Sequence, residues 1–166
     1  HTVSIDGGET FSKPERISHD NWVIRGCPHT GPAMTENKEG LHFTWFTGGK
    51  NAGCYYTKSR DNGKSFAMHD SVSSLGSHPQ IASLPGGELV VAWDEAIRAE
   101  NKINKKIGVQ KRTARGESEE KTFITADSEV ATYPVVSPVD KNASVIAYTK
   151  KKGGKNFIAY QLVRFN

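Results

Sequence analysis

A motif of eight residues occurs twice in this chain and constrains its fold more than any other feature of the sequence. Segments 4–11 (SIDGGETF) and 59–66 (SRDNGKSF) share the pattern Ser-x-Asp-x-Gly-x-(Thr/Ser)-Phe. A Ser or Asp side chain can accept hydrogen bonds from backbone N–H groups inside a turn, and glycine adopts a positive φ at low steric cost. We therefore expect two self-capped hairpin turns, each ending in a phenylalanine that points into a core. The residues expected to build them are Ser4, Asp6, Gly8, Thr10 and Phe11, and Ser59, Asp61, Gly63, Ser65 and Phe66.

A longer repeat follows three prolines. An aromatic residue stands 13 or 14 positions after each of Pro32, Pro79 and Pro134, with turn-forming residues in between. Each unit predicts a strand, a tight turn and a second strand, with the aromatic residues Trp45, Trp93 and Tyr148 at matching core positions. Third strands are predicted at 53–59, 107–113 and 157–163, fourth strands at 10–18, 65–72 and 121–127, and a charged loop at 94–106.

Units of roughly 45–55 residues with four antiparallel strands are typical of β-propeller blades. No helical periodicity competes over any long window of the sequence. We therefore predict an all-β fold with about three blades, in a single domain over residues 1–166. Its predicted parts are a closing strand with the first octapeptide (1–18), two blades (19–73 and 74–128) and an incomplete blade (129–166).

The composition excludes several classes of protein. The hydrophobic share of 36% and charged share of 24% are ordinary for a globular domain and argue against disorder. No apolar run approaches the roughly 20 residues of a membrane span, and the net charge of +4 comes without the basic stripe and interleaved aromatics expected of a nucleic-acid surface. No metal-ligand spacing is present, and no cofactor is predicted. Cys27 and Cys54 are predicted as free thiols, since first and third strands lie about 9.5 Å apart, beyond disulfide reach.

The octapeptides resemble the Asp-box, or BNR repeat, of the sialidase superfamily, whose members are six-bladed propellers. The segment 22–32, the FTWFT run and the following octapeptide are similar to uncharacterised bacterial BNR-repeat proteins described as sialidase-like. The resemblance implies that the chain is half of a six-bladed ring. It also implies an extracytoplasmic location.

About three blades are too few for a closed ring, since propellers have roughly 4–8. The first residues contain a fourth strand, whereas the last unit lacks one. Two explanations remain open: a homodimer in which two copies complete a six-bladed ring, or a longer protein whose N-terminal half is absent from this sequence.

The resemblance places ligand sites on one rim of the channel, where first strands begin and second strands end. The repeat alignment puts Thr47 and the predicted ligand-binding residues on this rim; the latter are Arg25, His29, His78, Asp94, Arg98 and Lys150. By resemblance, Tyr133 stands where a sialidase has its nucleophile, and Glu95 could activate it. The arginine triad of sialidases is not visible, and this absence favours structural or solvent-facing roles for Tyr133 and Glu95 over catalytic ones.

These features favour a sialidase-like propeller module that binds glycan on the channel rim and is not catalytic as an isolated chain. The alternative from another class is a scaffold that binds proteins. A third hypothesis is an exo-glycosidase of the sialidase type.

Overall fold

The first half of the chain forms a four-stranded antiparallel sheet. The computed structural model describes residues 1–24, 26–27, 29–99 and 102–165, and this part of the chain is all-β, without a helix. None of it could cross a membrane as a helix. The first sheet has the strand order β1-β2-β3-β4, with β1 at Ala33–Asn37, β2 at Gly40–Thr47, β3 at Gly53–Ser59 and β4 at Asp70–Ser73.

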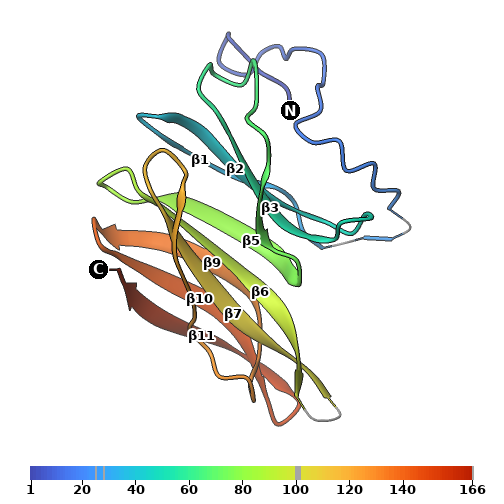
Figure 1. Cartoon of the computed structure of the whole chain (residues 1–166), viewed down its shortest axis with the longest axis vertical. Coiled ribbons are helices and arrows are strands. Elements are labelled where there is room, and N and C mark those ends of the chain that lie inside the picture. Colours follow the sequence, from blue (N-terminus) through green and yellow to red (C-terminus); the bar gives the residue numbers. More distant parts are fainter. Residues whose placement is uncertain (25, 28, 100–101, 166) are drawn as a thin grey trace.

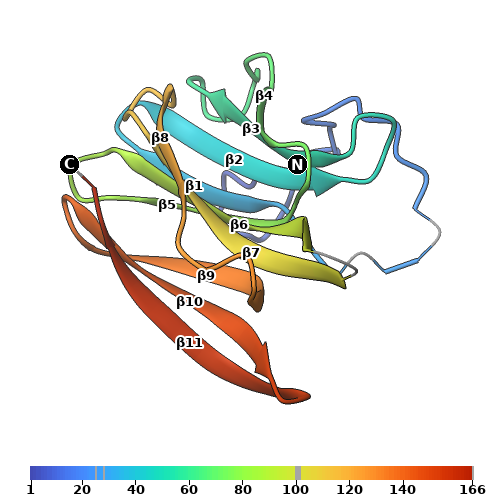
Figure 2. The same ribbon diagram turned by 60° about the horizontal axis from the view of Figure 1, so that its bottom comes forward.

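The second sheet contains seven strands in two antiparallel groups. The first group comprises β5 (Gly76–Ser83), β6 (Leu89–Ala99), β7 (Lys102–Arg112) and β8 (Ser118–Phe123). The second comprises β9 (Val130–Asp140), β10 (Ala143–Lys152) and β11 (Lys155–Arg164). A short parallel pairing of β7 with β9, at Lys105 and Val130, joins the groups. Figure 1 shows the first sheet above the second, and Figure 2 shows three layers, with β1–β4 at the top, β5–β7 in the middle and β9–β11 at the bottom.

Two hydrophobic cores lie between these layers. β6 begins with the run LVVAW, whose side chains are fully buried on both faces of the strand, as expected for a strand covered on both sides. One face packs against the first sheet and the other against β9–β11. The core toward the first sheet contains Cys54, Tyr56, Val72, Ile81, Leu89, Val91 and Trp93, and the other contains Leu84, Val90, Ala92, Ile107, Val109, Ala131, Ile146, Tyr148 and Phe165.

Several predicted boundaries were wrong. The described part of the segment 94–106 is not a loop, because β6 extends to Ala99 and β7 begins at Lys102. The segment 10–18 forms no strand, and the predicted strands at 65–72 and 121–127 are shorter or shifted. Both cysteines are free, as predicted; Cys54 is buried and Cys27 is exposed.

The octapeptides form the same turn in both copies. In the second copy, the hydroxyl of Ser59 accepts the N–H of Gly63 at 2.8 Å, and the carboxylate of Asp61 accepts the N–H and the hydroxyl of Ser65 at 2.9 and 2.5 Å. These bonds, led by that of the Ser65 hydroxyl, lower the pKa of Asp61 to about 2. The first copy makes the corresponding bonds. Its phenylalanine was wrongly predicted to be in a core, because Phe11 is 63% exposed.

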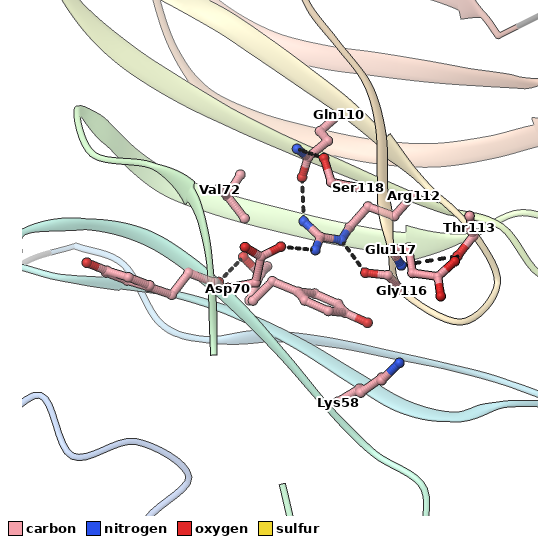
Figure 3. Close-up of polar contacts among 12 residues, drawn as sticks. Lys58, Asp70, Val72, Gln110, Arg112, Thr113, Gly116, Glu117 and Ser118 are labelled. Carbon is pink, nitrogen blue, oxygen red and sulfur yellow. Dashed lines mark hydrogen bonds and ion pairs between the residues drawn. The ribbon is translucent and has the colours of Figure 1, made fainter. Parts of the chain in front are cut away.

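A buried arginine connects the two sheets. The guanidinium of Arg112, on β7, forms an ion pair with Asp70 at the start of β4 and donates to the carbonyl of Gly116 at 2.9 Å and to Gln110 at 2.6 Å (Figure 3). It also lies 4.0 Å above the ring of Tyr56, on β3. Because Arg112 is almost fully buried, these contacts replace the hydration that its charge loses.

A buried histidine extends this connection. The Tyr56 hydroxyl lies 2.7 Å from Nδ1 of His42, whose Nε2 lies 2.9 Å from Oδ1 of Asn37. The Asn37 amide nitrogen donates to the carbonyls of Gly87 and Ala114, so its oxygen accepts from Nε2–H and Nδ1 accepts from the tyrosine. In its neutral form, His42 therefore makes both of these hydrogen bonds, one through each ring nitrogen. Burial, assisted by the charges of Lys58 and Arg112, lowers the pKa of His42 from 6.5 to about 4.

Protonation of His42 should weaken the fold. Between pH 6.5 and about 4 the unfolded chain binds a proton that folded His42 does not, so stability falls as the pH falls through this range. We expect a loss of up to about 3 kcal/mol in the free energy of unfolding, measured by denaturant titration at pH 7 and pH 4. His42→Gln should reduce this pH dependence, whereas replacement of exposed His19 by Gln should preserve it. An unchanged pH dependence in His42→Gln would contradict the assignment.

Candidate functional site

Four residues from four strands meet at the buried carboxylate of Asp94, on β6. Nδ1 of His78 (β5) lies 2.6 Å from Oδ2, Nζ of Lys105 (β7) lies 2.7 Å from Oδ1, and the backbone N–H of Tyr133 (β9) donates to Oδ2 at 3.0 Å. The side chain of Asp94 is fully buried. We call these four residues the Asp94 cluster.

The register of the strands explains why these four residues lie together. Ser77, the residue before His78, pairs with Asp94 across β5 and β6. Lys105 pairs with Ala96, two positions beyond Asp94, so its side chain lies on the same face of the sheet, diagonally across. The pairing of Lys105 with Val130 then brings the start of β9 beside the same carboxylate.

His78 and Tyr133 share an unusual backbone conformation. Their φ angles are 51° and 54°, in the left-handed region, and each precedes a proline. Each sits at a register shift, opposite Trp93 in one case and Tyr148 in the other. A bulky residue held in this region costs about 1–3 kcal/mol, and such strain clusters at functional sites. Asp94 stabilises both positions through its bonds to the His78 ring and the Tyr133 N–H.

The surroundings of the Asp94 carboxylate favour its ionised form. Burial is the largest effect on Asp94 and raises its pKa, but the hydrogen bonds from His78, Lys105 and the Tyr133 N–H together outweigh it and keep the pKa below 3.8. Because the ionised carboxylate accepts from Nδ1–H of His78, the Nε2 of that ring is left to accept or donate elsewhere.

The two rings form a small aromatic ledge. The centroids of His78 and Tyr133 lie 4.2 Å apart with the planes tilted by 42°. Tyr133 is 49% exposed, so one part of its ring packs on His78 while the remainder faces solvent. An apolar ring surface with a few fixed polar groups is the usual make-up of a small-molecule site.

The structure brings together three of the residues singled out from the sequence: His78, Asp94 and Tyr133. Glu95, the predicted partner of Tyr133, lies on the opposite face of β6, since neighbouring side chains alternate. Its Oε2 accepts from the Ser73 hydroxyl at 2.6 Å and from Trp93 Nε1 at 3.0 Å. The geometry therefore gives Glu95 a role in packing the first sheet onto β6.

The other predicted rim residues are dispersed. Lys150, on β10, forms an ion pair with Glu129 at 2.5 Å. Arg98 is exposed near the end of β6, and Thr47 is buried at the end of β2. His29 is exposed and has a φ of 51°, like His78. Arg25 lies outside the described residues.

Lys105 is the member of the cluster that the sequence interpretation missed. It belonged to a run of charges assigned to a solvated loop. The signal that would have found it is the hairpin itself, because Lys105 and Asp94 become cross-strand neighbours only if β6 and β7 continue to Ala99 and Lys102. Among the described residues, no group of three acidic, His or Cys side chains could hold a metal ion.

A cavity of about 650 Å³ lies between the N-terminal segment and β2. Trp22 lines it, packing edge-on against Phe46 at 5.5 Å between ring centroids. A Cβ on Gly48 would come within 2.8 Å of the Trp22 ring, so this loop requires glycine. Trp45 also lines the cavity and donates to Asp20 at 2.8 Å. These contacts hold the N-terminal segment on the first sheet, which accounts for the aromatic residues there.

Comparison with known proteins gives a structural likeness without a function. No family model and no curated protein matches the chain. The fold is similar to the crystal structure of a protein of unknown function from Dyadobacter fermentans, with a TM-score of 0.73 and 18% identity. The match covers 99% of this chain and 45% of that one, so this chain spans less than half the length of its structural neighbour. At this identity the likeness concerns the fold alone, and the resemblance to Asp-box proteins stays a prediction.

Removal of the Asp94 carboxylate should destabilise the protein. Asp94→Ala leaves the Lys105 ammonium and the Tyr133 N–H without their acceptor, and we expect a loss of about 3–5 kcal/mol in the free energy of unfolding, measured with urea. Asp127, whose exposed carboxylate pairs with Lys106 at 3.3 Å, provides the control, and Asp127→Ala should cost less than about 1 kcal/mol. Equal, small losses in both variants would contradict a stabilising role for Asp94.

Proposed function

We propose that this chain is a propeller module that binds carbohydrate at the Asp94 cluster. The observation that carries the proposal is the pair of strained residues, His78 and Tyr133, which one buried carboxylate holds in place. The ring of Tyr133 is half-exposed and faces solvent. A rigid aromatic surface can pack against the apolar face of a sugar ring. The free ring nitrogen of His78 and the hydroxyl of Tyr133 can bond sugar hydroxyl groups.

Three features support the propeller as the architecture of this module. Consecutive antiparallel groups of strands pack face to face as layers (Figure 2). The octapeptide turn occurs twice with the same hydrogen bonds. The structural neighbour is more than twice as long as this chain. In this proposal the chain supplies three blades of a six-bladed ring.

The last layer has a face that the described residues leave uncovered. Val135, Ala147, Ile158, Tyr160 and Leu162 lie on one side of β9–β11, because their strands pair in register and side chains alternate. Ile158 and Tyr160 are 79% and 73% exposed. We call this side the open face. Apolar surface of this kind favours association, and the proposed partner is a second copy that completes the ring, the alternative being an N-terminal half in a longer protein.

The assembly can be tested by mass. We expect the chain to sediment at about twice 18.2 kDa at micromolar concentration, because the open face loses its contact with water when two copies associate. Ile158→Lys combined with Tyr160→Lys places charges on that face and should yield a species of 18.2 kDa. A monomer at every concentration, in the unaltered chain, would refute the two-copy ring.

Carbohydrate binding can be tested with a glycan array. Tyr133→Ala removes the exposed ring and His78→Ala removes its support, so each is expected to weaken binding to the best glycan more than about tenfold. Phe11→Ala removes an exposed ring outside the Asp94 cluster and should leave binding unchanged. If the unaltered chain binds no glycan, the proposal fails and the alternative, a scaffold that binds proteins, is favoured. Unaltered binding in Tyr133→Ala would place the site elsewhere.

A further inference from the structure

Two hairpins project at the end of the molecule that carries the Asp94 cluster. Lys105 on β7 pairs with Val130 on β9, and Val130 also pairs with Lys151 on β10. The β6–β7 and β10–β11 hairpins therefore extend beyond the same end of the second sheet, as Figure 1 shows at the bottom of the molecule. We call them the basic hairpins, because the exposed charged side chains near their projecting ends, among the described residues, are all cations: Arg98, Lys102, Lys151, Lys152 and Lys155.

The nearby acidic side chains are already used within the protein. Asp94 is bound by His78 and Lys105, Asp127 pairs with Lys106 at 3.3 Å, and Glu129 pairs with Lys150 at 2.5 Å. Glu95 accepts bonds from Ser73 and Trp93 on the other face of the sheet. Glu100 lies outside the described residues. The five cations of the basic hairpins therefore form no ion pair with the described acids at this end of the sheet, and together they present a positive field to solvent.

We propose that this end binds an acidic polysaccharide, a chain of carboxylated or sulfated sugars that contacts the His78–Tyr133 ledge and extends across the basic hairpins. The inference rests on the proposed function and adds the ligand class. Four of the five cations are lysines, which act as mobile point charges and suit anions repeated along a flexible chain. A single-stranded nucleic acid would instead require a row of aromatic platforms. On the Asp94 cluster and the projecting ends of the basic hairpins, the exposed aromatic rings among the described residues are the His78–Tyr133 ledge and Phe157 on β11, which do not make up such a row.

The experiment compares two triple charge reversals that change the net charge equally. Lys151, Lys152 and Lys155 are replaced by Glu in the first, and the exposed lysines at 13, 64 and 141, outside the basic hairpins, in the second. Binding of polygalacturonate, heparin and neutral dextran is measured by calorimetry in about 50 and 200 mM salt. We expect the unaltered chain to bind one of the acidic polymers, to lose roughly tenfold in affinity at the higher salt, and to bind dextran far more weakly.

The first triple variant should lose at least about tenfold in affinity for that polymer, and the second should behave like the unaltered chain. Equal losses in both variants would overturn the inference, because net charge alone would then explain the attraction. Equally tight binding of single-stranded DNA would overturn it in favour of a general polyanion surface. If the chain binds neutral glycans through Tyr133 but neither acidic polymer, the inference fails and the proposed function stands. If it binds no sugar of any kind, both fail.

Discussion

Burial of Trp93 is the constraint on which the rest of the structure depends. The indole is fully buried between β6 and the first sheet, and two glycines provide its space. A Cβ at Gly108, directly across on β7, would come within 2.4 Å of the ring, and one at Gly76 within 2.8 Å. Its Nε1 donates to Glu95, which also accepts from Ser73 at the end of β4. One large side chain thus determines its neighbours on three strands and connects the two sheets.

The same residue explains why the candidate site lies where it does. The register of β5 shifts opposite Trp93, and this irregularity contains His78 in its left-handed conformation. Because side chains alternate along β6, Trp93 and Glu95 face the first sheet while Asp94 faces β9. Asp94 is therefore buried where it can bond both His78 and the backbone of Tyr133. Trp93, which packs against the first sheet, and Asp94, which binds the polar cluster on the other side, are therefore consecutive residues of one strand.

Repeats in the sequence predicted the all-β class and the position of several strands. They also placed His78, Asp94 and Tyr133 on one rim, but they did not predict the contacts that join these three residues. β3 has the bounds predicted for it, and the prolines place both strained residues at equivalent points of two strands. The repeats work here because turn residues and buried aromatics are local signals. They did not reveal the β6–β7 hairpin, whose lysines pair with acids such as Asp94 and Asp127 across strands. Because these pairings are not visible in the local sequence, the charged composition of β6–β7 resembles that of a solvent-exposed loop.

The proposed site divides binding between a rigid part and a mobile part. Asp94 holds the His78 ring and the backbone of Tyr133 before any ligand arrives, and the Tyr133 ring packs on His78. Little conformational entropy is therefore lost there on binding, and shape selectivity belongs to His78 and Tyr133. Exposed lysines on the hairpins have many rotamers, and their contribution is long-range attraction and association rate, which salt weakens. Strain at the ledge is tolerated because the buried carboxylate offsets it, and loss of Asp94 would remove stability and site geometry together. Fold and proposed function are therefore coupled through one side chain, whereas the basic hairpins can change without effect on the core.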